Sequence, residues 1–224
     1  AGEGDGDPAR FQDARGDLRQ QRQVEEVVGR VEQDDLGAAP GQTVVADSTT
    51  VMLYKLLRAL ADGQVTADPA RTQIVVDTDN FPTDRYVAEG VAAERGMELV
   101  WIEADPASGV SVEQVAEVVG ERTAVVLLSH VAYRSGYLAD APAITRVVHE
   151  AGGLVLWDLC HSAGSVPVEL DAWGADAAVG CTYKYLNGGP GSPAFAYRAR
   201  RHHGILQQPI QGWMGRRDPF LMAA

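Results

Sequence analysis

Short apolar runs alternate with amphipathic stretches along most of this chain. The apolar runs predict strands at 43–46, 73–77, 97–102, 124–128, 154–157, 175–181 and 194–197. The stretches between them predict helices at 51–60, 82–95, 111–119 and 140–151, with Gly63 ending the first. Such alternation is typical of crossover units that build a parallel sheet. It predicts an α/β fold of three layers, in which helices cover both faces of a mainly parallel sheet.

The first part of the chain differs from this alternating region. Residues 1–23 are rich in Gly, Asp, Arg and Gln, and the spacing of valines within 25–32 predicts a helix. A Gly- and Pro-containing break follows at 37–41. We therefore expect an irregular or helical lead-in over residues 1–40 and a main domain over residues 41–204.

Polar residues gather where the predicted strands end. The carboxyl ends of parallel strands meet at one edge of a sheet, and ligands of such sheets bind there. Five strand ends carry polar groups, at 47–50, 79–84, 129–130, 158–161 and 182–184. Their common position predicts one ligand site, which is a stronger indication than any single motif among them.

Lys184 is the most informative residue of this set. It follows an apolar run and precedes a Gly- and Pro-rich turn. Burying an ammonium group costs several kcal/mol unless the group is paired or used chemically. A desolvated Lys has a lowered pKa and can form a Schiff base with the aldehyde of pyridoxal phosphate (PLP). The alternative is a Lys at a strand end whose stem packs while its head reaches solvent.

Asp158 and His161 stand one strand earlier. Asp158 ends an apolar strand, so a cationic partner such as the nitrogen of a pyridinium ring would compensate its charge. The alternative role is a cap for the segment that follows. His161 either packs near the cofactor, close to its phenolic oxygen, or is a structural histidine.

Five further residues can each be interpreted either as part of a ligand site or as an ordinary structural residue. Thr49 and Thr50 open a predicted helix, where free N–H groups favour a phosphate, although ordinary capping also explains them. Phe81 can stack on a flat ring or act as a hydrophobic staple, and Asp84 can cap its helix or touch the ligand. Tyr183 offers a phenol for a phosphate contact or for proton transfer.

The composition limits the kinds of partner and the cellular compartment that we expect for this chain. The chain has 224 residues, 46% of them hydrophobic, and a formal charge of −12, which argues against nucleic acid or an anionic membrane as partner. No apolar run approaches the roughly 20 residues of a membrane span, and the first residues do not resemble a signal peptide. Cys160 and Cys181 have neither a disulfide framework nor metal-ligand spacing. We expect no metal and a reducing cytoplasm.

Two strings closely resemble the kynureninase family. They are Asp-Leu-Cys-His-Ser-Ala-Gly at 158–164 and Gly-Cys-Thr-Tyr-Lys-Tyr-Leu-Asn-Gly-Gly-Pro-Gly at 180–191. The segments 80–84 and 211–213 look like two further signatures of that family, and the resemblance runs from about residue 41 to the end. It implies a PLP enzyme of the aspartate-aminotransferase fold, with residues 41–204 as the PLP-binding large domain and residues 205–224 leading to a small domain.

The resemblance also implies individual roles. Lys184 would form the Schiff base with PLP, Asp158 would pair with the pyridine nitrogen, and Phe81 would stack on the ring with Asp84 nearby. The residues implied to bind the phosphate, directly or as helpers, are Thr49, Thr50, Tyr183, Ser129, His161 and Trp213. Trp213 would serve the site of a neighbouring subunit, which implies a homodimer.

The implied reaction is hydrolytic cleavage of the Cβ–Cγ bond of L-kynurenine, giving anthranilate and L-alanine. The 3-hydroxy analogue would give 3-hydroxyanthranilate, and the pathway would be tryptophan degradation, which also feeds NAD biosynthesis. Lys184 would remove the Cα proton, while Tyr183 would be the acid for the developing carbanion.

The chain departs from the family pattern in three places. The family's small domain, with an Arg and an Asn for the substrate, is largely absent, and its early Gly-rich segment is not recognisable in residues 1–40. Arg216 stands where the family usually has His. We expect a cofactor-binding domain truncated at both ends.

Three alternatives remain beside a kynureninase. One is a PLP-binding but catalytically incomplete module for dimerisation or binding. A cysteine desulfurase is disfavoured because Cys160 and Cys181 fall in ordered motifs and Phe81 stands where those enzymes stack a His. A nicotinamide dehydrogenase is disfavoured because no Gly-x-Gly-x-x-Gly follows a strand.

Overall fold

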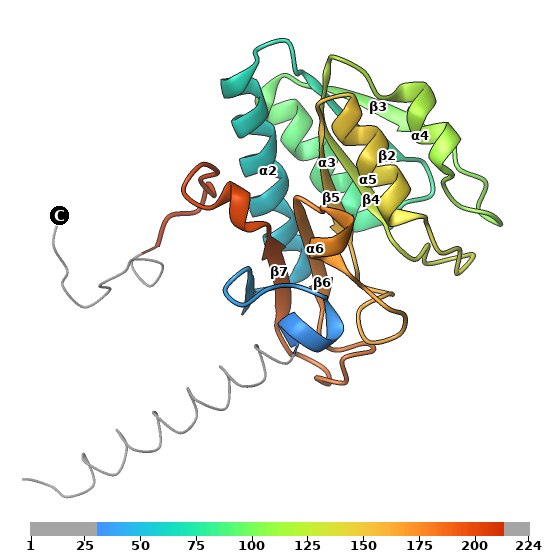
Figure 1. Ribbon diagram of the computed structural model, residues 1–224, viewed down its shortest axis with the longest axis vertical. Coiled ribbons are helices and arrows are strands. Elements are labelled where there is room, and N and C mark those ends of the chain that lie inside the picture. Colours follow the sequence, from blue (N-terminus) through green and yellow to red (C-terminus); the bar gives the residue numbers. More distant parts are fainter. Residues whose placement is uncertain (1–30, 213–224) are drawn as a thin grey trace, which may run out of the picture.

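A seven-stranded sheet organises residues 31–212, the part of the chain that the computed structural model describes (Figure 1). The strands are β1 Thr43–Ala46, β2 Gln73–Asp77, β3 Glu98–Ile102, β4 Thr123–Ser129, β5 Leu154–Asp158, β6 Ala177–Cys181 and β7 Ala194–Arg198. Their order across the sheet is β1-β7-β6-β5-β4-β2-β3. The neighbours from β3 to β6 pair in parallel, whereas β7 is antiparallel to both β6 and β1. The prediction of a mainly parallel sheet is confirmed.

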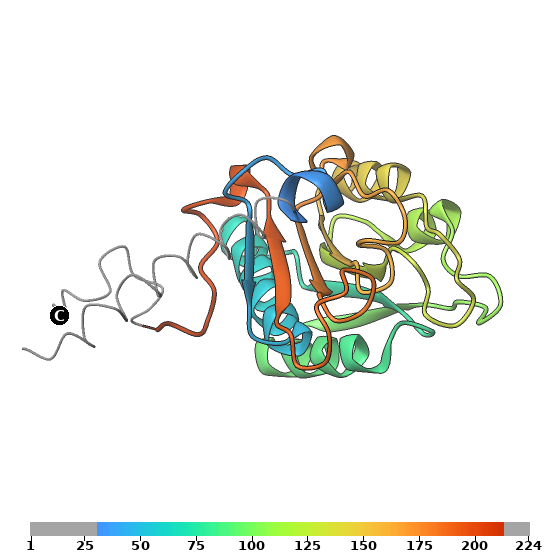
Figure 2. The ribbon, with the colours of Figure 1, turned by 90° about the horizontal axis from the view of Figure 1, so that it is seen from below.

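Helices cover both faces of this sheet and complete three layers. The α-helices are α2 Thr49–Ala67, α3 Pro82–Arg95, α4 Val112–Val118, α5 Ala141–Glu150 and α6 Leu170–Trp173, with short helices η1 Val31–Asp35 and η2 Arg200–His202. In Figure 2, α2 and α3 lie below the sheet, and α4 and α5 lie above it. Two buried clusters, one on each face, hold the layers together. The predicted three-layer architecture is confirmed.

The interior strand β4 shows why the two clusters form. Successive side chains of a strand point to opposite faces. Val125 and Leu127 therefore pack with α2 and α3, while Val126 and Leu128 pack with α4 and α5. All four side chains are buried to 1% exposure or less. An apolar run without alternation was the sequence signal for such a strand.

Helix α3 begins and ends where the sequence predicts. Pro82 occupies the first helical turn, where its missing N–H costs nothing and its fixed φ suits the helix. Gly96 ends the helix at φ 63°, a left-handed conformation that glycine adopts without strain. These local signals need no distant contact, and they fix the start of α3 beside the strand end at Asp77.

The prediction that Gly63 ends the preceding helix is wrong. Helix α2 runs on to Ala67, and the N–H of its C-cap residue Asp68 donates to the Gln64 carbonyl. A Cβ atom at Gly63 would collide with the side chain of Leu206, which packs on the helix at that point. Gly63 therefore leaves room for the side chain of Leu206 and does not end the helix.

The predicted lead-in is tied to the sheet through one buried carboxylate. Most of the helix expected at 25–32 lies outside the described residues, and Val31–Asp35 forms a short π-helix. Glu32 in that helix is 4% exposed, and its carboxylate accepts hydrogen bonds from the N–H groups of Gln42 and Thr43, each at 2.6 Å. These hydrogen bonds attach the π-helix at Val31–Asp35 to the edge strand β1.

Within residues 31–212, no helix has the length and apolar character that crossing a membrane requires.

Asp176 joins three elements at the amino ends of the strands, away from the predicted site. Its carboxylate accepts hydrogen bonds from His149 Nε2 at 2.8 Å, Arg201 Nη2 at 2.6 Å and His202 Nε2 at 2.8 Å. The N–H of Val155 donates a fourth, at 2.8 Å. Burial by itself would raise the pKa of Asp176, but the hydrogen bonds from the two histidines bring it below the ordinary 3.8. The carboxylate is therefore a fully partnered buried charge.

We expect Asp176→Asn to destabilise the fold by about 3–5 kcal/mol at pH 7, because it removes one member of a buried charge network. A carboxyl with a lowered pKa stabilises the fold above the ordinary value of 3.8, and this contribution disappears as the pH falls below it. The difference from the native chain in urea unfolding should therefore shrink from pH 7 to pH 3. The exposed Glu117→Gln is the matched control. An equal difference at both pH values would contradict this interpretation of Asp176.

Candidate active site

A cavity of about 160 Å³ lies at the carboxyl edge of the sheet. Its walls come from the ends of β5 and β6, the start of α2 and the junction between β2 and α3. The lining residues are Ser48, Thr49, Thr50, Phe81, Thr83, Asp84, Asp158, Cys160, His161, Tyr183 and Lys184. The sequence-predicted site residues are all among them except Ser129, which lines a different cavity, and Trp213, which lies outside the described residues.

The head of Lys184 lies inside this cavity. Its Nζ is 3.0 Å from His161 Nε2 and 5.7 Å from the ring centroids of both Phe81 and Tyr183. Burial and the neighbouring ammonium lower the pKa of His161, so the imidazole is neutral near pH 7 and accepts a hydrogen bond from Lys184. The amine is thus held among ring faces by a single neutral acceptor.

Asp84 and Asp158 form a buried pair of carboxyl groups on the cavity wall. Asp84 is 1% exposed and Asp158 is 3% exposed. Burial, and then the charge of Asp158, raise the pKa of Asp84 well above its usual range, with Lys184 acting in the opposite direction. Oδ2 of Asp84 has no hydrogen-bond partner among the described residues. Burial beside Asp158 therefore favours the neutral form of the Asp84 carboxyl group.

Asp158 is placed both to cap the segment that follows it and to face a ligand, the two interpretations that the sequence left open. Its Oδ1 accepts a hydrogen bond from the N–H of Cys160 at 2.8 Å, which caps the turn after β5. The same carboxylate lines the cavity beside Asp84. Capping orients the side chain, and this orientation leaves its charge available to a cationic group of a ligand.

The start of α2 forms the wall of the cavity that is best suited to an anion. Ser48 is the N-cap residue, and its Oγ accepts a hydrogen bond from the N–H of Val51 at 3.4 Å. Because Ser48 does the capping, the hydroxyls of Thr49 and Thr50 remain on the first turn beside the free N–H groups. The positive end of a 19-residue helix favours a phosphate there.

Phe81 is positioned by Asn80, which the sequence analysis did not identify. Asn80 is 2% exposed, and its Oδ1 accepts hydrogen bonds from the N–H of Phe81 at 2.8 Å and from Ser129 Oγ at 2.9 Å. Its Nδ2 donates to the Leu127 carbonyl at 3.3 Å. The ring of Tyr133 meets the Phe81 ring edge-on, with centroids 5.3 Å apart. An Asn between a strand end and an aromatic residue was the available signal.

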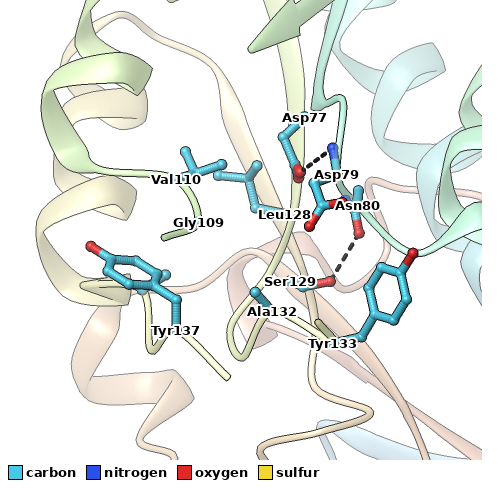
Figure 3. A pocket seen from close by; sticks show the side chains of 11 residues that line it. Asp77, Asp79, Asn80, Gly109, Val110, Leu128, Ser129, Ala132, Tyr133 and Tyr137 are labelled. Atoms are coloured by element: carbon cyan, nitrogen blue, oxygen red, sulfur yellow. Dashed lines mark hydrogen bonds between the residues drawn. The ribbon is translucent and has the colours of Figure 1, made fainter. Parts of the chain in front are cut away.

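Ser129 lies in a second, smaller cavity of about 20 Å³ (Figure 3). In that view its hydroxyl points to Asn80, and the carboxylate of Asp77 accepts from the N–H of Asp79 at 3.0 Å. Burial raises the pKa of Asp77 to about 6. In this structure Ser129 acts on the Phe81 loop through Asn80, and its contact with a phosphate stays a prediction.

Tyr183 lies at the mouth of the cavity. Its side chain is 50% exposed, and burial together with the nearby Cys181 raises the pKa of its phenol. The hydroxyl is therefore protonated at neutral pH and can donate a hydrogen bond. Its predicted role in binding a phosphate or in proton transfer stays a prediction.

The donor set fits a flat, phosphorylated aldehyde with a basic ring nitrogen. The cavity combines an amine at Lys184, a negative charge at Asp158, an aromatic face at Phe81 and a helix N-terminus. The unpartnered Oδ2 of Asp84 marks a buried polar position that the chain itself does not satisfy. These groups are the ones that PLP requires, so the site and the predicted cofactor agree chemically.

Comparison with known proteins places these features in a family. The profile of the family described as aminotransferase class-V matches residues 21–202. A kynureninase of Burkholderia pseudomallei is 48% identical over 189 residues, and one of Pseudomonas fluorescens is 46% identical over the same length. Each alignment covers 84% of this chain and 44% of the relative. The chain thus spans less than half the length of the curated relatives that it matches.

Solved structures of distant sequence have the same fold. The cystine C–S lyase C-DES, in complex with its product cysteine persulfide, has a TM-score of 0.76 at 19% identity, covering 88% of this chain and 51% of that one. The apo cysteine desulfurase of Thermococcus onnurineus has a TM-score of 0.74 at 20% identity, covering 87% of this chain and 47% of that one. At this level of identity the likeness concerns the fold alone.

We expect Asp84→Asn to stabilise the cofactor-free chain increasingly as the pH rises from 4 to 8. A carboxyl whose folded pKa is raised loses stability as the pH passes from its ordinary value up to the folded one, by about 1.4 kcal/mol per unit of difference. The neutral amide does not incur this loss. Urea unfolding across this pH range measures the effect, with exposed Glu89→Gln on the same helix as control. A difference that does not grow with pH would show that Asp84 is ionised in the fold.

Proposed function

Since the chain belongs to the aminotransferase class-V family, we propose that its cavity binds pyridoxal 5′-phosphate and that it is the cofactor-binding part of a kynureninase. The observation that carries the proposal is the cavity itself. It brings the Lys184 amine and the buried Asp84–Asp158 pair together with the first turn of α2. Kynureninases with 46–48% identity over 84% of the chain support the choice within the family.

Each wall of the cavity has a part in holding the cofactor. Lys184 offers the amine for the aldehyde, and Asp158 faces the ring nitrogen, whose positive charge compensates the buried carboxylate. Phe81 presents a ring face that Asn80 and Tyr133 hold in place. The N-terminus of α2 receives the phosphate. Bound in this way, PLP supplies an electron sink for a carbanion at the substrate Cα.

We assign the proton transfers of the reaction to Lys184 and the residues around it. The Lys184 amine takes the Cα proton of the substrate, and His161 Nε2, 3.0 Å away, keeps the amine oriented. The negative charge of Asp158 keeps the ring nitrogen protonated. The phenol of Tyr183 is protonated at neutral pH and is the proposed acid that delivers a proton to the developing carbanion.

The proposed substrate is L-kynurenine or its 3-hydroxy form, cleaved hydrolytically at the Cβ–Cγ bond. The products are L-alanine and anthranilate or 3-hydroxyanthranilate, a step of tryptophan degradation. We assign this activity to the whole protein, as a cytoplasmic homodimer in which Trp213 serves a neighbouring subunit. A cysteine desulfurase fits less well, because Cys160 and Cys181 are buried at 8% and 3% exposure. That reaction needs an exposed nucleophilic thiol.

Incubation of the purified chain with PLP should give a visible absorption band that borohydride abolishes. We expect Lys184→Ala to lack the band, because no other amine lines the cavity among the described residues. Lys55→Ala is the matched control, since Lys55 lies outside the cavity and pairs with Asp47 at 2.6 Å. Absence of the band from the native chain, or its persistence in Lys184→Ala, would overturn the cofactor assignment.

A fluorescence assay of anthranilate release from L-kynurenine separates an enzyme from a binding module. We expect the protein loaded with PLP to release anthranilate, and Asp158→Asn to reduce the rate by at least about 100-fold, since the ring nitrogen loses its charge partner. PLP binding without turnover by the chain would support the catalytically incomplete module instead.

A further inference from the structure

The two cysteines of the chain lie close together, Cys181 at the end of β6 and Cys160 in the turn that follows β5. In the parallel pairing of β5 with β6, Asp158 stands opposite Val179. The same register continues past the strand end, because the N–H of Leu159 donates to the Val179 carbonyl at 2.8 Å. Cys160 follows in the turn after β5, and its carbonyl oxygen lies 3.8 Å from the Sγ of Cys181 at the end of β6.

The side chains of the two cysteines interact, and each thiol shifts the pKa of the other. The Cys181 thiol already reaches towards the turn after β5, with its Sγ 3.8 Å from the Cys160 carbonyl oxygen. Joining the sulfurs requires rotation of both side chains.

The two sulfurs differ in acidity, and this difference assigns their roles. A hydrogen bond from Cys160, helped by the Lys184 ammonium, lowers the pKa of Cys181 to about 6 against the effect of burial. The same contact and burial raise the pKa of Cys160 far above its usual range. At neutral pH Cys181 is the thiolate and Cys160 is the thiol.

The cavity gives small molecules a route to Cys160, whose carbonyl oxygen contacts the Cys181 sulfur. Cys160 is 8% exposed and forms part of the cavity wall, where its Sγ lies 3.9 Å from Thr49 Oγ1. A hydroperoxide is small and uncharged, so it can enter where a larger reagent cannot. A ligand that fills the cavity closes this route.

We propose that Cys160 and Cys181 are a modification site, at which a hydroperoxide forms a reversible disulfide beneath the cavity. The Cys181 thiolate attacks one peroxide oxygen, and the O–O bond breaks to give a sulfenic acid and hydroxide. The Cys160 sulfur then attacks the Cys181 sulfur, its thiol proton leaves, and the sulfenic oxygen departs as water. With hydrogen peroxide, two thiols lose two electrons in total and the peroxide becomes two water molecules.

The disulfide changes the wall of the cavity. It draws the Cys160 sulfur from Thr49 towards β6 and ties the turn after Asp158 to the segment that carries Lys184. Two walls that hold the predicted cofactor move relative to each other. We therefore expect the oxidised chain to bind PLP more weakly and bound PLP to protect the thiols. These two expectations rest on the proposed function, whereas the disulfide itself does not.

Mass spectrometry of the cofactor-free chain treated with hydrogen peroxide tests the disulfide directly. We expect the mass to fall by two hydrogens, with a tryptic peptide linking Cys160 to Cys181 and full reversal by dithiothreitol. The rate at pH 5 should be about a tenth of that at pH 7, since the thiolate of Cys181 is then mostly protonated. Oxidation to sulfinic acid without a linked peptide, a disulfide between two chains, or no reaction would each overturn the proposal.

Single variants separate the two roles. Cys160→Ser should stop at a sulfenic acid on Cys181 that dimedone traps, and Cys181→Ser should neither form a disulfide nor react at a comparable rate. Trapping on Cys160 instead would reverse the assignment and contradict it. The same reaction is then run with saturating PLP. If the visible band forms and the disulfide still appears at an unchanged rate, access through the cavity is wrong; if no band forms, the proposed function fails while the disulfide remains tested.

Discussion

The carboxyl groups of Asp84 and Asp158 are buried together on the wall of the cavity, where burial and the charge of Asp158 raise the pKa of Asp84. The fold creates this pair by bringing the end of β5 against the first turn of α3. Around it stand the Lys184 amine, the Phe81 ring and the N-terminus of α2. The cavity therefore holds an acceptor without a partner in the part of the chain that the structure describes, and a ligand with a cationic ring and an anionic tail complements the carboxyl pair and the helix N-terminus.

A comparison of Asp84 with Asp176 distinguishes a carboxyl group suited to ligand binding from one that stabilises the fold. Asp176 is buried as deeply, at 1% exposure, but His149, Val155, Arg201 and His202 all donate to it. Each of its lone pairs is used, and its pKa is lowered. The pKa of Asp84 is raised and one of its oxygens has no partner. At one edge of the sheet a carboxylate holds elements together, and at the other edge a carboxyl group is kept for a ligand.

The ends of β5 and β6, which build part of the site, also bring two thiols together beside it. Asp158 ends β5, and Cys160 follows it by two residues in the next turn. A movement of this turn therefore displaces both the carboxylate that faces the cavity and the sulfur that borders it. Lys184 follows Cys181 by three residues on the neighbouring strand's end. Cofactor binding and thiol oxidation thus act on one small group of backbone segments, which is why we expect each to oppose the other.

The sequence by itself determined the strands, the extent of α3 and most of the residues around the cavity. Those signals are local: apolar runs, Pro82 and Gly96 at the helix ends, and polar residues at strand ends that a parallel sheet brings to one edge. Only the tertiary structure decided the antiparallel place of β7 beside β1, the packing of Leu206 on Gly63 and the role of Asn80. Each of these depends on contacts between residues far apart in the chain. Such contacts leave no periodic or capping signal, because their energy arises only once the distant partners meet.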